Sequence, residues 1–207
     1  MKAVIIAGGN ISDYNILREE CDKADKIICA DSGIRHAKFI NVIPDVWVGD
    51  FDSTDSMDYP AYEKVTLPRE KNDTDTHYAA RIALYMGASD VVILGGIGTR
   101  LDHTMANISV LNFIEEKGVR AKLADEHNTV FVVKGDKTVT IPKTEGSYLS
   151  LIPFTPTVQV SASGVKYPLK NVTMYADTTL GISNEFVCPQ AKITVKKGAL
   201  IVFISKD

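Results

Sequence analysis

Acidic side chains in the first half of this chain come in short groups, and each group follows an apolar or β-prone run. The groups are Asp31, Asp50 with Asp52, Asp73 with Asp75, and Asp102. Because carboxylates repel one another, a fold that brings them together needs a compensating cation. Carboxylate oxygens suit Mg²⁺, which proteins often bind together with the phosphates of a substrate. The pattern therefore predicts magnesium-dependent chemistry on a polyphosphate.

The segment Gly49-Asp50-Phe51-Asp52-Ser53 places two carboxylates one residue apart directly after an apolar run. Such a pair can converge on one cation, or it can belong to an ordinary turn, since Asp favours turns through bonds to its own backbone. The apolar run in front and the second acidic pair downstream favour the metal site. That second pair, in Asn72-Asp73-Thr74-Asp75, opens a predicted helix, and residues of these types are also common helix caps. If Asn72 or Asp73 is the cap, Asp75 lies one turn inside the helix.

A glycine-rich segment, Gly95-Gly96-Ile97-Gly98-Thr99-Arg100-Leu101-Asp102-His103, runs from a predicted strand into a predicted helix. Glycines let backbone N–H groups approach an anion, and a helix N-terminus favours negative charge. Arg100 can orient phosphate oxygens. Asp102 and His103 can form an acid–base pair, although capping is the commoner role of such residues. The segment lacks the GK[ST] of a Walker A loop, and an ordinary βα turn is the alternative.

Composition limits the classes of function. The chain has 207 residues, of which 45% are hydrophobic, and this allows one large domain or two small ones. A net charge of −3 without a basic cluster disfavours nucleic-acid and anionic-membrane partners. No apolar run approaches the roughly 20 residues of a membrane span, and Met1-Lys2 leads directly into a strand-like run rather than a signal peptide. Cysteines without a CxxC pair favour reduced thiols. We therefore expect a cytoplasmic location.

The elements that must position these residues divide the chain in two. Residues 1–125 alternate apolar runs with helical patterns, which predicts an α/β domain with a parallel sheet. Its expected strands are 3–7, 26–30, 45–49 and 91–94, and its expected helices start near 12 or cover 74–86 and 101–117. Residues 126–207 show period-two runs and turn residues, which predict a smaller all-β antiparallel sandwich. Ligands of parallel α/β sheets bind beyond the carboxyl ends of the strands, where Asp31, Asp50 and the 95–102 segment are expected.

Taken together, these segments resemble the thiamine pyrophosphokinase family in order and spacing. The matching segments are Asp31-Ser32-Gly33, Pro44-Asp45, Val48 to Ser53 (VGDFDS), Thr74-Asp75 with Ala79, Gly95 to Asn107 (GGIGTRLDHTMAN) and Ser183-Asn184-Glu185-Phe186. The resemblance spans nearly the whole chain. It implies a homodimer in which the first domain binds Mg-ATP and the second helps to form the thiamine site across the subunit interface. It also implies transfer of the pyrophosphoryl group of ATP to the thiamine hydroxyl, which gives thiamine diphosphate and AMP.

The resemblance also implies roles for individual residues. It makes Asp50, Asp52 and Asp75 the Mg²⁺ ligands and catalytic acids, with Asp102 and Arg100 beside them. The residues that it places on ATP and its phosphates are Asp31, Asp73, Gly98, Arg100 and His103, and those that it places on thiamine are Ser183 and Asn184. The chain departs from the family pattern at Ser32 and Thr99, where the family has glycine, and at Asn72, where many relatives have an acid. We expect these departures to tune nucleotide contacts without removing the reaction.

The expected reaction is an in-line attack of the thiamine hydroxyl on the β-phosphorus of ATP, which depends on positioning and charge neutralisation. Arg100 would stabilise the developing charge, and Asp102 or Asp75 would accept the alcohol proton. The sequence does not decide between these two acceptors. One alternative is a phosphatase with an aspartyl nucleophile at Asp50, because Asp50-Phe51-Asp52-Ser53-Thr54 fits a DxDx[TV] pattern. The other is a nucleotide- or thiamine-binding protein without turnover.

Overall fold

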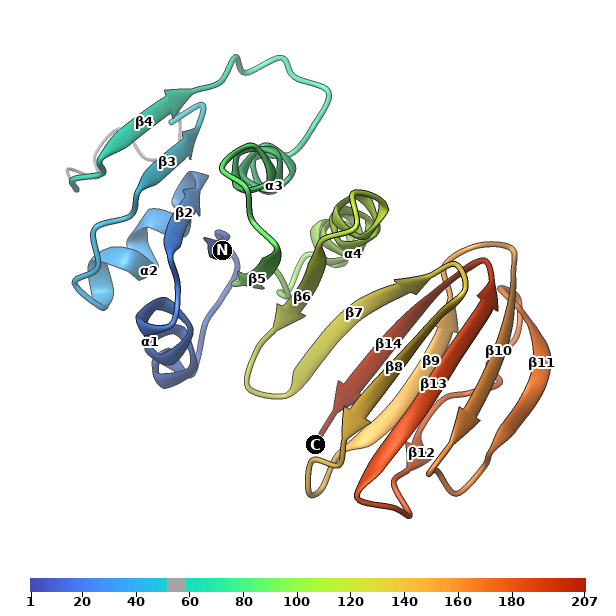
Figure 1. The fold of residues 1–207 in the computed structure, drawn as a ribbon. Helices are drawn as coiled ribbons and strands as arrows, with labels where there is room; N and C mark the ends of the chain where they lie inside the picture. The colour runs from blue at the N-terminus through green and yellow to red at the C-terminus, as the bar shows by residue number, and fades with distance from the viewer. Residues whose placement is uncertain (52–58) are drawn as a thin grey trace. The chain divides into compact units, whose positions relative to one another are not determined.

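The computed structural model describes residues 1–51 and 59–207, which form two compact units, Met1–Glu126 and His127–Asp207 (Figure 1). Each unit encloses a hydrophobic cluster of its own. Among the described residues, no helix has the length and apolar character needed to cross a membrane. The two units are described separately below.

The first unit contains a parallel sheet, and its strands run in the spatial order β6-β5-β1-β2-β3-β4. The strands are β1 (Lys2–Ile6), β2 (Lys26–Ala30), β3 (Val46–Gly49), β4 (Glu63–Thr66), β5 (Asp90–Leu94) and β6 (Arg120–Ala124). Residues such as Val4, Ile5 and Ile93 are fully buried, because both faces of the sheet are covered. The predicted α/β class is confirmed, and the strands expected at 3–7, 26–30, 45–49 and 91–94 are all present.

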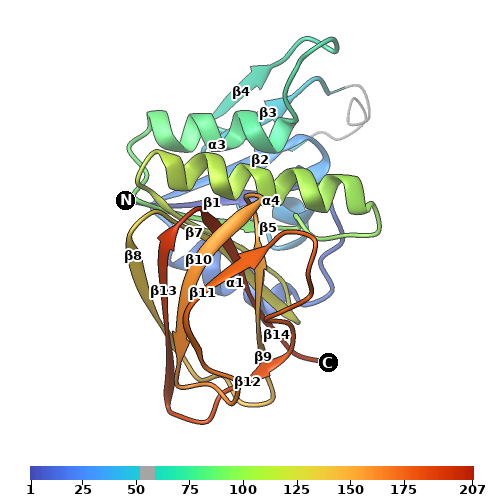
Figure 2. The same ribbon diagram turned by 90° about the vertical axis from the view of Figure 1, so that its right-hand side faces the viewer.

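Helices cover this sheet on its two faces (Figure 1). α1 (Tyr14–Asp22) and α2 (Ile34–Phe39) share one hydrophobic cluster with β1, β2 and β3, while α3 (Asp75–Tyr85) and α4 (Leu101–Glu116) lie side by side, as Figure 2 also shows. A 3₁₀ turn, η1 (Asp31–Gly33), links β2 to α2. Asp13 caps α1 by accepting from the Asn15 N–H, so the helix expected to start near residue 12 begins at Tyr14. The cap of α3 is Thr74, whose Oγ1 accepts from the His77 N–H at 3.2 Å, and neither Asn72 nor Asp73.

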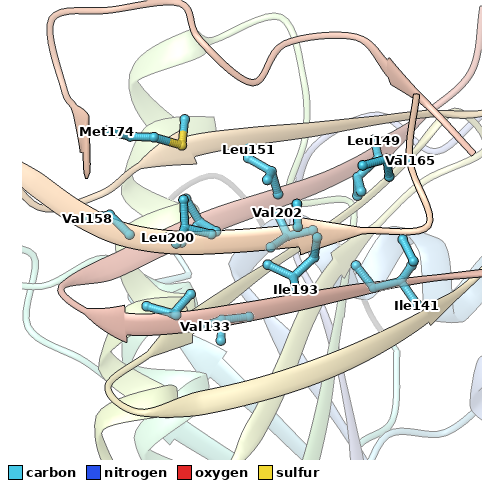
Figure 3. Packing of buried hydrophobic residues seen from close by; sticks show 14 of the residues in the cluster. Val133, Ile141, Leu149, Leu151, Val158, Val165, Met174, Ile193, Leu200 and Val202 are labelled. Atoms are coloured by element: carbon cyan, nitrogen blue, oxygen red, sulfur yellow. The ribbon is translucent and has the colours of Figure 1, made fainter. Parts of the chain in front are cut away.

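The second unit is an antiparallel β-sandwich, as predicted. One layer has the order β12-β9-β14-β7 and the other β11-β10-β13-β8. Its strands are β7 (Asn128–Lys134), β8 (Lys137–Pro142), β9 (Tyr148–Pro153), β10 (Thr157–Ser163), β11 (Leu169–Tyr175), β12 (Asn184–Glu185), β13 (Gln190–Lys197) and β14 (Ala199–Ser205). Alternate residues point inward, so Val158 and Ile193 are fully buried in the cluster that Figure 3 shows with Leu151, Leu200 and Val202.

The sequence patterns did not predict some of the short elements. The strands β4, β6, β11 and β12 and the helix α2 were not expected. β4 was not expected because Glu63–Thr66 contains no apolar run. The strand is mostly exposed, and only one of its residues is even partly buried. α2 has six residues, fewer than two full turns, and therefore shows no helical period.

Candidate active site

A cavity of about 280 Å³ lies beyond the carboxyl ends of β1, β2 and β5. Between β1 and β5 the order of the strands reverses, because β2 follows β1 on one side and β6 follows β5 on the other. A reversal of this kind is the usual ligand position of an open α/β sheet. The cavity is lined by Ala7–Asn10, Ala30–Ser32, Thr74–Thr76, Gly95–Arg100, His103 and Asn107.

The turns after β1 and β5 touch each other at this cavity. The Gly9 N–H donates to the Gly95 carbonyl at 2.8 Å, and a Cβ on Gly9 would lie only 2.4 Å from that oxygen. A Cβ on Gly8 would lie 2.2 Å from Oγ of Ser32. The hydroxyl of Ser32, the residue that replaces a family glycine, therefore fits only because residue 8 has no side chain. Both glycines are needed for this close approach.

Two side chains of α4 fix the glycine-rich turn. The buried Asn107 donates through Nδ2 to the Gly96 carbonyl at 2.8 Å, and Thr104 Oγ1 accepts from the Gly98 N–H at 3.3 Å. Gly98 therefore lines the cavity as predicted, with its own N–H engaged by the protein. The turn is held in shape before any ligand arrives.

Asp31 lines the cavity in a backbone conformation that side chains rarely adopt, with φ of 47°. Its carbonyl accepts from Trp47 Nε1 at 2.9 Å. Phe51, between the two acids of the Asp50 group, also has a positive φ, 59°, and its ring lies edge-on against Trp47 at 4.7 Å. Left-handed backbone at an Asp and at an aromatic residue costs free energy and is concentrated at functional sites. The buried Trp47 thus contacts both segments that carry the acids.

A partly buried lysine joins two of the predicted acids. Nζ of Lys71 lies 3.2 Å from Oδ2 of Asp50 and 2.8 Å from Oδ1 of Asp75, and the Lys71 side chain is only 10% exposed. Burial raises the pKa of the Asp75 carboxyl, and the charges of Asp31 and Asp50 raise it further while Lys71 lowers it. Burial by itself lowers the pKa of Lys71, but its bonds to Asp75 and Asp50 outweigh burial and raise that pKa. Lys71 is therefore a charged ammonium shared by two carboxylates.

The donors of this cluster suit Mg²⁺ in combination with phosphates. Among residues 1–51 and 59–207, no three His, Cys, Asp or Glu side chains form a ready metal site. Asp52, the third predicted ligand, lies outside the described residues. Oδ1 of Asp75 is buried and, within the described chain, accepts no hydrogen bond of good geometry, although the ammonium is near it. Mg²⁺ commonly takes one or two carboxylates and completes its octahedron with water and phosphate oxygens, so this donor set fits the ion.

A second, exposed ion pair lies at the start of α4. Arg100 contacts Asp102 through both Nε, at 3.2 Å, and Nη2, at 2.6 Å, with side chains 70% and 66% exposed. The hydrogen bonds from Arg100 and from the His103 N–H lower the pKa of the Asp102 carboxyl. Arg100 and His103 line the cavity as predicted, whereas Asp102 is not among its lining residues. A carboxylate with a lowered pKa is a weak proton acceptor.

Asp73 lies away from the cavity lining. Its two oxygens contact side chains of α3, with Oδ1 3.2 Å from Nδ1 of His77 and Oδ2 2.8 Å from Nη2 of Arg81. The sequence placed Asp73 on the phosphates of ATP, and the structure gives that carboxylate to the helix instead. Because Thr74 is the cap, Asp75 is the first helical residue and is the acid of this pair that faces the cavity.

The two residues predicted to contact thiamine differ in whether their polar side-chain groups are available to a ligand. Asn184 is 4% exposed, and its amide is used by the chain, because Oδ1 accepts from the N–H groups of Tyr167 and Glu185 and Nδ2 donates to the Tyr167 carbonyl. Ser183 is exposed, has a φ of 55°, and is held by a hydrogen bond from its N–H to Ser150 Oγ. Asn184 shapes the turn, and Ser183 presents its hydroxyl.

Sequence patterns gave little warning of two residues near the cavity. From the sequence Lys71 could reach a phosphate, although an exposed position is commoner for a lysine; its side chain is only 10% exposed, between Asp50 and Asp75. His36 is one of several scattered histidines that the sequence places on the surface or in a helix; it is in α2 but is 3% exposed. The available signal for Lys71 was its position in Glu70-Lys71-Asn72-Asp73, close before the helix that carries Asp75.

Comparison with known proteins matches both units to domains of one family. Residues 17–123 match the family model "Thiamin pyrophosphokinase, catalytic domain", and residues 136–200 match "Thiamin pyrophosphokinase, vitamin B1 binding domain". The chain is 30% identical to thiamine pyrophosphokinase of Bacillus subtilis over 215 aligned residues, which cover all of both chains. The crystal structure of a Bacillus subtilis thiamine pyrophosphokinase matches with a TM-score of 0.87 at 28% identity, over the full length of both chains. A family member from Enterococcus faecalis matches with a TM-score of 0.86 at 26% identity, again over both full lengths.

Proposed function

The chain belongs to the thiamine pyrophosphokinase family, and we propose that it transfers the diphosphoryl group of ATP to the hydroxyl of thiamine, releasing AMP. One observation of the structure supports this activity most strongly. The glycine turns after β1 and β5 and the carboxylates of Asp31 and Asp75 border the same cavity at the strand-order reversal. Backbone N–H groups and a metal-binding acid cluster are the two features that a nucleoside triphosphate requires.

The first unit is the proposed site of Mg-ATP. The turns at Gly8–Asn10 and Gly95–Arg100 would receive the phosphates, and Arg100 would move from Asp102 to the phosphate charge, because its exposed pair with Asp102 contributes little to stability. Asp50, Asp52 and Asp75 would hold Mg²⁺, which when bound neutralises the negative charge of the phosphate oxygens. Lys71 would then be released from at least one carboxylate and add its own positive charge near the phosphates.

Asp75 is the proposed acceptor of the thiamine hydroxyl proton. It lines the cavity in which the phosphates are proposed to bind, and one of its carboxylate oxygens could accept the proton while the other holds Mg²⁺. Asp102 is exposed, lies outside the lining, and has a lowered pKa.

The second unit is the proposed thiamine-binding part. Its match to the vitamin B1 binding domain of the family supports this role, and the exposed Ser183 hydroxyl is the contact that it would offer. Homodimer formation and a cytoplasmic location stay predictions.

The direct test of this activity measures AMP formation from ATP and Mg²⁺ with and without thiamine. We expect AMP to appear only when thiamine is present, together with one thiamine diphosphate for each AMP. Release of inorganic phosphate with a trapped phospho-aspartate at Asp50 would contradict the proposal in favour of a phosphatase. Binding of both ligands without any AMP would contradict it in favour of a binding protein.

A further inference from the structure

A buried histidine lies under the turn that follows β1. His36 is 3% exposed, with Nε2 2.7 Å from the Gly9 carbonyl and Nδ1 2.8 Å from the Tyr14 hydroxyl. Nε of Arg35 also lies 3.3 Å from Nε2, and both groups cannot donate along that contact. The Gly9 carbonyl is nearer and only accepts, so we assign the proton to Nε2, and Nδ1 accepts from Tyr14. Burial lowers the pKa of His36, which favours this neutral form. Every polar atom of the ring therefore has a partner, and the ring fixes the Gly9 carbonyl.

A neighbouring arginine holds the same turn from its exposed side. Nη2 of Arg35 donates to the Gly8 carbonyl at 2.7 Å and to the Gly9 carbonyl at 3.2 Å. Two successive carbonyls of the turn are thus drawn toward α2. Without these donors they would be exposed to the negative charges of a ligand in the cavity that Gly8 and Gly9 line.

The orientation of these carbonyls determines where the N–H groups point. In a planar trans peptide the N–H is directed opposite to the C=O, and the described chain contains no cis peptide bond. The peptide between Gly8 and Gly9 is fixed at both ends, because its N–H donates to the Gly95 carbonyl. In the next peptide His36 and Arg35 hold the Gly9 carbonyl, so the Asn10 N–H is directed away from α2.

The Asn10 nitrogen lies at the cavity. Asn10 and Gly98 both line it, and the Asn10 nitrogen lies 3.9 Å from the point where a Cβ of Gly98 would be. That separation leaves space beside the nitrogen at a residue that has no side chain. A phosphate oxygen placed there would receive a charge-assisted hydrogen bond.

We propose that Arg35 and His36 are positioning residues that hold the Gly9–Asn10 peptide with its N–H toward the cavity, where it donates to a phosphate oxygen of the nucleotide. Neither side chain touches the nucleotide in this arrangement. The inference rests on the proposed function, because it takes a nucleotide to be the ligand of this cavity.

The experiment uses the full chain with Mg²⁺ and a non-hydrolysable ATP analogue. Calorimetry gives the affinity of the analogue for His36→Leu, His36→Gln and Arg35→Gln, and thermal unfolding gives their stability. We expect His36→Leu to weaken binding about tenfold, the size of one lost hydrogen bond to a charged group, while the KM for thiamine is unchanged. His36→Gln should recover most of the affinity, because its amide can still donate to the Gly9 carbonyl.

Two further measurements separate positioning from mere stabilisation. Arg120→Gln is the matched control for Arg35→Gln. Arg120 is also exposed, but it is the first residue of β6 and therefore lies at the amino ends of the strands, away from the cavity. Selective ¹⁵N labelling of asparagine should show the Asn10 amide resonance shifting on analogue binding in the wild type and in Arg120→Gln, and a reduced shift in His36→Leu.

The results divide clearly. If the wild type binds the analogue and the folded Arg35→Gln and His36→Leu proteins bind it equally well, the positioning role is overturned. An Asn10 resonance that does not move on binding overturns it too. A wild type that binds no analogue overturns the proposed function itself.

Discussion

Two charged clusters flank the same cavity, and they differ in environment rather than in the type of residue. Lys71 is 10% exposed and is shared by Asp50 and Asp75, whereas Arg100 is 70% exposed and has Asp102 as its partner. In the first cluster one ammonium is shared by two carboxylates, and all three side chains are less than a quarter exposed. The second is balanced and solvated, and such pairs contribute little stability. This difference supports the proposal that the Lys71 cluster would hold the metal and that Arg100 would leave Asp102 for a ligand.

The largest effect should come from the buried cluster. We expect Asp50→Asn, and equally Asp52→Asn, to lower kcat by about 10³-fold, because each removes a metal ligand whose contribution is several kcal/mol. The melting temperature should change little. Asp90→Asn is the control, since Asp90 is the first residue of β5 and the cavity lies beyond the other end of that strand. Folded Asp50→Asn protein with normal AMP production would show that the metal assignment is wrong.

Lys71→Met should give the next largest effect, and its dependence on metal distinguishes charge from packing. With EDTA present, the carboxylates of Asp50 and Asp75 lose their cation, and the free energy of unfolding should fall by up to about 3 kcal/mol. Excess Mg²⁺ should restore more stability to this variant than to the wild type. Denaturant unfolding in both buffers measures this. An equal loss in the two buffers would mean that Lys71 only fills space.

The exposed cluster should show smaller effects that separate its two members. We expect Arg100→Gln to lower kcat/KM by about tenfold to a hundredfold, with stability within about 0.5 kcal/mol of the wild type. Asp102→Asn should lower kcat less than tenfold, because the pKa of Asp102 is lowered and its side chain is exposed. Steady-state kinetics on both variants tests the comparison. A loss for Asp102→Asn as large as that for Asp50→Asn would make Asp102 the proton acceptor.

The smallest effect concerns a buried group in neither cluster. Burial lowers the folded-state pKa of His36 below its ordinary 6.5, so the unfolded chain binds the proton more readily. The resulting stability is present above pH 6.5 and is lost as the pH falls through the lowered pKa. Denaturant unfolding between about pH 5 and 8 should therefore show a slope that His36→Gln reduces. Tyr14 and Arg35, which face the ring, are unchanged in that variant. Identical slopes would contradict the burial effect.

The placement of some acids could be predicted, because it follows from the alternation of strands and helices. Apolar runs before Asp31 and Asp50 are typical of buried parallel strands, and the carboxyl ends of such strands meet at one edge. Asp31 and Asp75 line the cavity, whereas Asp50, Asp73 and Asp102 are not among its lining residues. The sequence pattern could not show which of Asp73 and Asp75 faces the cavity. That depends on which residue caps α3, and the cap is Thr74.

The remaining features depend on tertiary contacts that have no local signal. Asp31 and Phe51 both have a positive φ, and both contact Trp47, Asp31 through its carbonyl and Phe51 through its ring. Nothing in the local sequence distinguishes Lys71 from other lysines, and only the fold places two carboxylates beside it. His36 likewise becomes a support for the Gly9 carbonyl only because α2 packs beneath β1.

A crystal structure with Mg²⁺ and a non-hydrolysable ATP analogue tests the central claim most directly. The account predicts the polyphosphate between the Gly8–Asn10 and Gly95–Arg100 turns, Mg²⁺ on Asp50 and Asp75, and Lys71 moved from at least one of them. A nucleotide bound elsewhere, with Asp50 and Asp75 still joined through Lys71 and no metal between them, would contradict it.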